Sequence, residues 1–339
     1  MNLPQPKPIR EFENVDRALF DGAIRPSLQP AVLRGAALHW PAVRAARESD
    51  EAIVDYVKRF SEGRRVAAIV GEPEIEGRFF YSDDLRGFNF QRGQSPLDPF
   101  LDRLLRDRDH PSPMAMAVQS EIIPDVLAGF EVENGLDLVR SDVAPRAWIG
   151  NRIRVSPHFD HNENVGVVVA GRRRFTLFPP EQTPNMYVGP LELTPAGTPV
   201  SMVDPLNPDL DRFPRFANAM DAAQTATLEP GDAIYIPYHW FHGVESLEPL
   251  NFLVNYWWTD ARTDLGRPYD ALLHAFFALK HLPPDQRAVW RDMFDYYVFE
   301  TNGDPAEHLP EHVRGILGEP TPELLAKMRA TLKQIGANL

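Results

Sequence analysis

Between Ala147 and Asp260 the chain consists of short β-rich runs separated by turn residues, and this pattern restricts the folds that it can adopt. The runs are WIG, VGVVVAG, RFTLFPP, ATLEPGDAIYIP and LNFLVNYWW, rich in the β-branched and aromatic residues that favour strands. The 33 prolines are spread from Pro4 to Pro322, which suits many short strands joined by turns. The pattern predicts a mainly β protein with a jelly-roll or β-sandwich core and flanking helices.

Helical periodicity occurs on both sides of this β-rich stretch. Apolar residues recur at helical spacing from Ser49, and the same period returns after Pro268. The domains expected are an N-terminal strand and helix extension (1–64), a β core (65–262) and a C-terminal helical segment (263–339).

Composition narrows the chemistry open to the chain. Without cysteine it can hold no disulfide or iron–sulfur cluster and has no thiol nucleophile, so His, Asp and Glu are its strong metal ligands. A formal net charge of -13 opposes nonspecific binding to nucleic acid. No apolar run has the length of a signal peptide or a membrane span, so we expect a cytoplasmic protein.

One ordered set of motifs carries metal-binding residues. His158 and Asp160 are two residues apart in SPHFDHN, and a strand would send both side chains to one face. After the PGD turn, IPYHWFHGVES supplies His239 and His242 as rivals for a third ligand. Two histidines and one carboxylate leave three positions of an ion open, which suits Fe(II) that must bind a bidentate cosubstrate and then O2.

An HxD pair alone is a weak signal, but the order HxD, glycine-bounded strand, FPP, long loop, PGD, IP, distal His and NYWW is specific. From about Gln29 to Trp258 the chain resembles the JmjC-type, cupin-like oxygenases that depend on Fe(II) and 2-oxoglutarate, a group that includes the asparaginyl hydroxylase factor inhibiting HIF. The resemblance implies a double-stranded β-helix core. By the family's W-x-H pattern, the iron ligands would be His158, Asp160 and His242.

The same resemblance implies a set of residues around the cosubstrate. They are Asn164, Asn255, Trp257, Arg173 and Ser156. Arg173 stands where the family usually has a lysine that pairs with the distal carboxylate of 2-oxoglutarate, and its guanidinium offers a bidentate fork for that role. The family's Thr or Ser before the HxD motif corresponds to either Val155 or Ser156.

The activity implied is a hydroxylase that couples decarboxylation of 2-oxoglutarate by O2 to hydroxylation of a C–H bond. A peptide or protein side chain is the preferred substrate class, since the loop at 181–216 and the C-terminal helices could flank an extended groove. A small metabolite or a tRNA base is the next class. Rival hypotheses are a noncatalytic cupin that binds a ligand or partner, and a cupin that uses Mn or Zn.

Several other residues have structural explanations. Neighbours on a strand alternate sides, so of the run at 172–174 only Arg173 is expected to face inward. The C-terminal helices carry more apolar residues than solvent-facing helices need, which predicts a homodimer. The histidines expected at the surface or in helix packing are His161, His274, His281, His308 and His312.

Overall fold

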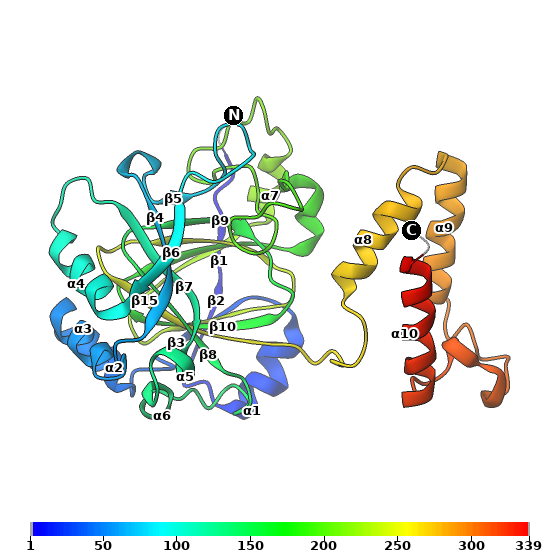
Figure 1. The fold of residues 1–339 in the computed structure, drawn as a ribbon, viewed down its shortest axis with the longest axis horizontal. Coiled ribbons are helices and arrows are strands. Elements are labelled where there is room, and N and C mark those ends of the chain that lie inside the picture. Colours follow the sequence, from blue (N-terminus) through cyan, green and yellow to red (C-terminus); the bar gives the residue numbers. More distant parts are fainter. Residues whose placement is uncertain (1–2, 338–339) are drawn as a thin grey trace. The chain divides into compact units, whose positions relative to one another are not determined.

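The computed structural model describes residues 3–337 and divides the chain into two compact units, Met1–Thr259 and Asp260–Leu339 (Figure 1). The first unit holds two mixed β-sheets with flanking helices. In the second, the described residues form helices and turns. The mainly β fold expected from the sequence is confirmed.

The strands of the first unit divide between the two sheets. The six-stranded sheet has the order β1 (Lys7–Pro8), β12 (Gln224–Leu228), β11 (Arg173–Phe178), β14 (Phe241–Ser246), β9 (Arg154–His158), β5 (Arg78–Phe79). The nine-stranded sheet has the order β2 (Arg10–Glu13), β3 (Ala31–Arg34), β13 (Ala233–Ile236), β10 (Glu163–Ala170), β15 (Asn251–Trp258), β8 (Pro145–Gly150), β7 (Ala115–Ile122), β4 (Arg65–Gly71), β6 (Gln91–Pro96). From β8 to β11 each successive strand changes sheet, and so do the strands from β12 to β15, as in a jelly roll.

Strand β10 shows why an uninterrupted apolar run forms the centre of this fold. Val167 and Val169 pack in the cluster that also holds helix residues such as Ile53, while Val168 packs in the cluster between the sheets with Phe175. Both faces of the strand are therefore covered, which explains why VGVVVAG lacks polar alternation. Each such valine contributes roughly 1.5–3 kcal/mol through burial.

The three longest helices of the first unit lie on the outer side of the nine-stranded sheet (Figure 1). They are α2 (Pro41–Glu48), α3 (Asp50–Lys58) and α4 (Leu97–Asp107). The helix predicted from Ser49 is confirmed as α3: the Ser49 hydroxyl accepts the backbone N–H of Ala52 at 3.1 Å, and Ile53 and Val57 are buried.

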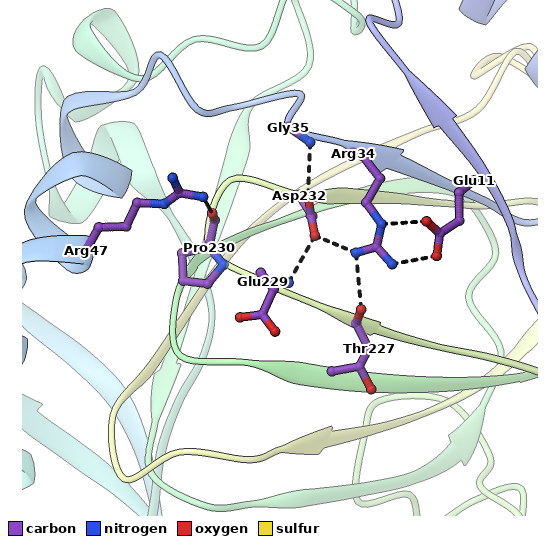
Figure 2. Close-up of polar contacts among 8 residues, drawn as sticks. All are labelled: Glu11, Arg34, Gly35, Arg47, Thr227, Glu229, Pro230 and Asp232. Atoms are coloured by element: carbon purple, nitrogen blue, oxygen red, sulfur yellow. Dashed lines mark hydrogen bonds and ion pairs between the residues drawn. The ribbon is translucent and has the colours of Figure 1, made fainter.

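The PGD turn between β12 and β13 ties the N-terminal strands to the core, as Figure 2 shows. The carboxylate of Asp232 accepts from the backbone N–H groups of Gly35 (2.9 Å) and Glu229 (3.1 Å) and from Arg34 Nη1 (2.6 Å). Arg34 also forms a bidentate pair with Glu11 at 2.6 and 2.9 Å. The first 64 residues thus supply β1, β2 and β3 to the two sheets.

The segment between β11 and β12, which contains the loop expected to flank a substrate groove, is packed in place. Met186, Val203 and Phe216 are fully buried in a cluster with Phe178 and Phe241. It also contains a 3-10 helix at Pro180–Asn185 and ends in α7 (Phe216–Ala222). This burial suits a fixed wall better than a lid.

The second unit contains α8 (Pro268–Leu279), α9 (Pro284–Tyr297) and α10 (Pro322–Ala337). Large apolar side chains of this unit are exposed, with Phe277 at 68%, Ile316 at 67% and Phe299 at 66%. Among the described residues, no helix has the length and apolar character needed to cross a bilayer.

Candidate metal centre

The structure brings His158, Asp160 and His242 together in one cluster. One ligand atom from each lies within 4.8 Å of the others, and His239 is not part of the group. The two imidazole rings have centroids 4.3 Å apart, and Asp160 Oδ2 lies 3.4 Å from His242 Nε2. Both histidines are buried, with His158 8% and His242 4% exposed. The three residues can share a single ion.

Strand pairing places the two histidines. His158 at the end of β9 lies directly opposite His242 in β14. On the other edge of β9, His158 forms a bridge with Val200, and the N–H of Ser201 donates to the Pro157 carbonyl at 2.7 Å. The packed loop before β12 therefore holds the ligand strand in place from the side opposite β14.

Asp160 lies outside the strand on which the sequence pattern placed it. β9 ends at His158, so Asp160 lies on the connection to β10 and not on a strand. Strand alternation therefore does not explain why its carboxylate faces the histidines.

Hydrogen bonds orient both imidazoles. His158 Nδ1 lies 3.0 Å from the Ser156 carbonyl, and His242 Nδ1 lies 3.1 Å from the Trp240 carbonyl. Because a carbonyl only accepts, each Nδ1 carries a proton, and Nε2 is the ring nitrogen placed to bind a metal. Burial, and then repulsion from His242, lowers the pKa of His158 to about 4, so this imidazole is neutral at pH 7, as a metal ligand must be.

The donor set fits a divalent cation. Asp160 Oδ2 is buried and has no hydrogen-bond partner among the described residues. A desolvated carboxylate oxygen is costly unless something compensates its charge. Two imidazole nitrogens and one carboxylate oxygen with open positions beside them are the ligands of non-haem Fe(II) sites.

Arg173 is a buried cation without an anionic partner. It is 5% exposed, while its neighbours Arg172 and Arg174 are exposed and pair with glutamates, as strand alternation predicted. Its Nη2 donates to the Trp148 carbonyl at 3.3 Å, and its Nε is buried with no hydrogen-bond partner in the described part of the chain. Burial lowers the pKa of Arg173 to about 9, which still leaves it charged at pH 7. Such a group is suited to binding a carboxylate.

The predicted cosubstrate residues of the nine-stranded sheet form a polar chain. Asn255 Nδ2 donates to Asn164 Oδ1 at 3.1 Å, and Trp148 Nε1 donates to Asn255 Oδ1 at 2.7 Å. Trp257 packs edge-on against Trp148 at 5.7 Å, and its Nε1 is buried without a partner. Trp148 was missed from the sequence, although its indole and its carbonyl connect Asn255 to Arg173.

The Ser156 hydroxyl has a different neighbour from the one expected. It accepts from Arg78 Nε at 3.3 Å and lines a small pocket whose lining includes none of the three metal ligands. Val155 packs against the core between the sheets. His158 pairs with His242 and Val155 with Val244, so β9 advances three residues where β14 advances two. This bulge breaks the alternation that would place Ser156 on the same face as His158. These contacts do not support the cosubstrate role expected of Ser156.

A comparison with family models identifies the fold. The model described as a cupin-like domain matches residues 17–264. The chain belongs to the cupin-like domain family. This confirms the resemblance to JmjC-type, cupin-like oxygenases.

Curated relatives of this cupin-like protein carry oxygenase names among others. This chain is 30% identical over 245 residues to HSPB1-associated protein 1 of Bos taurus, and the match covers 68% of this chain and 48% of that protein. It is 29% identical over 273 residues to the bifunctional peptidase and (3S)-lysyl hydroxylase JMJD7 of Homo sapiens, covering 72% and 81%. It is 28% identical over 238 residues to lysine-specific demethylase 8 of Danio rerio, covering 68% and 53%. The chain spans about half the length of the HSPB1-associated relatives it matches.

Proposed function

We propose that this protein is an Fe(II) and 2-oxoglutarate dependent dioxygenase that hydroxylates a side chain of a peptide or protein. The observation that carries the proposal is the cluster of His158, Asp160 and His242, in which one buried carboxylate oxygen has no hydrogen-bond partner within residues 3–337. A noncatalytic cupin would have no need to keep two buried imidazoles and a carboxylate this close together.

Each residue has a role in this reaction. The three ligands hold Fe(II), which, when bound with 2-oxoglutarate and O2, supplies the oxidation that converts C–H to C–OH as the acid becomes succinate and CO2. Arg173 binds the distal carboxylate of 2-oxoglutarate through its guanidinium, whose Nε makes no hydrogen bond to the described residues. Trp148 fixes the Arg173 fork through its carbonyl.

The preferred substrate class rests on the relatives and on charge. JMJD7 is named a (3S)-lysyl hydroxylase, and another relative is named a lysine-specific demethylase. The net charge of -13 favours encounter with basic segments of a partner protein.

A turnover assay tests the proposal. The full chain, incubated with Fe(II), ascorbate and labelled 2-oxoglutarate, is expected to release succinate, and basic candidate peptides should increase the release. The His158→Ala chain is the control, because it loses a metal ligand. Equal succinate from both proteins, with and without peptides, would contradict the proposed function.

We also propose a homodimer formed through the second unit. Its exposed apolar side chains include Phe277, Val289 and Phe299, and exposed apolar surface of this kind marks protein interfaces. Sedimentation velocity is expected to show a dimer that dissociates on dilution, and Phe277→Asp should shift it towards monomer. A monomer at all concentrations would refute the dimer.

A further inference from the structure

The metal ligand Asp160 lies in a short connection whose position strand pairing does not determine. β9 ends at His158 and β10 begins at Glu163, so residues 159–162, here called the carboxylate loop, join the two sheets. A carboxylate must be held closely to bind a metal tightly, which requires other contacts to fix this loop.

One residue, His239, contacts three consecutive members of the carboxylate loop. Its backbone N–H donates to the Asp160 carbonyl at 3.3 Å. Its ring stacks on Phe159, with centroids 4.8 Å apart and planes at 28°. Its Nε2 lies 2.8 Å from His161 Nδ1, within hydrogen-bond distance.

The backbone of His239 is strained, with a φ of 61° in the left-handed region that residues with a Cβ rarely adopt. Such a conformation persists where the surrounding contacts require it, and it occurs often at functional sites. In this conformation the N–H of His239 points at the Asp160 carbonyl.

The same contacts reach the segment that carries the third ligand. Phe159, stacked on His239, meets Phe241 edge-on at 5.1 Å, and Phe241 directly precedes His242. The carboxylate loop and the start of β14 are therefore packed together around one imidazole.

We propose that His239 and His161 form a positioning pair that holds the carboxylate loop so that Asp160 can serve as a metal ligand. This inference rests on the proposed function, since it assumes that the cluster binds metal. His239 is thus not a ligand, but it acts on the metal through Asp160.

Cobalt binding tests the pair. The metal-free full chain is titrated with Co(II), a stand-in for Fe(II) whose visible absorbance reports its coordination. His239→Asn keeps a residue that tolerates the left-handed backbone but removes the imidazole, and His161→Ala removes the other member. Each is expected to weaken Co(II) affinity roughly 10-fold or more, while the unfolding temperature of the metal-free chain stays near wild type.

The matched control is His39→Asn, at an exposed histidine before α2, which should bind Co(II) like wild type. Wild-type affinity and absorbance in both His239→Asn and His161→Ala would overturn the positioning pair. If His239→Asn does not fold, His161→Ala decides alone. A wild-type chain that binds no Co(II), or Asp160→Ala that binds it undiminished, would instead overturn the proposed function and the pair with it.

Discussion

The Asp160→Ala substitution is expected to lower Fe(II) affinity and succinate formation by more than roughly 100-fold. That is more than the effect of losing a residue that only hydrogen-bonds to a metal ligand. The reason is that Asp160 supplies the only carboxylate of the cluster. Fe(II) affinity by anaerobic titration and succinate release measure the effect. Without metal, the substitution removes a buried carboxylate oxygen that has no hydrogen bond among the described residues, so we do not expect the unfolding temperature to fall.

Asp221→Ala is a suitable control, because Asp221 is an exposed aspartate in α7. It should bind Fe(II) like wild type. Retention of Fe(II) affinity and turnover by the Asp160→Ala chain would show that the cluster is not the catalytic metal site.

Arg173→Met is expected to raise the KM for 2-oxoglutarate roughly 10- to 100-fold, since a charge-assisted hydrogen bond contributes about 1.5–3 kcal/mol. The effect should fall mainly on KM, because the distal carboxylate is bound alike before and during the reaction. Arg173→Lys keeps the cation but not the fork, so its loss should be smaller. Succinate formation at varied 2-oxoglutarate measures all three proteins.

Arg172→Met is the matched control, since Arg172 is exposed and pairs with Glu248 at 2.6 Å. Its KM should remain that of wild type. A KM unchanged in Arg173→Met, or raised equally in Arg172→Met, would remove Arg173 from cosubstrate binding. Removal of a buried cation that has no carboxylate partner should not destabilise the fold.

Local pattern alone predicted much of this protein. The β-branched and aromatic runs bounded by turn residues, and the helical period after Ser49, both arise from burial, which follows the geometry of each element. Alternation on β11 predicted that Arg173 turns inward between two exposed arginines. The three residues of the candidate metal cluster could also be found in the sequence, with the choice of His242 over His239 resting on the family's W-x-H pattern.

The tertiary structure alone decided how these residues meet. A bulge in β9 turned the Ser156 hydroxyl towards Arg78, and Asp160 fell beyond the strand end. The bridge of Val200 to His158 and the contacts of His239 with the carboxylate loop join segments distant in sequence. Such contacts depend on how two sheets pack and on where pairing registers slip, and neither leaves a repeating signal along the chain.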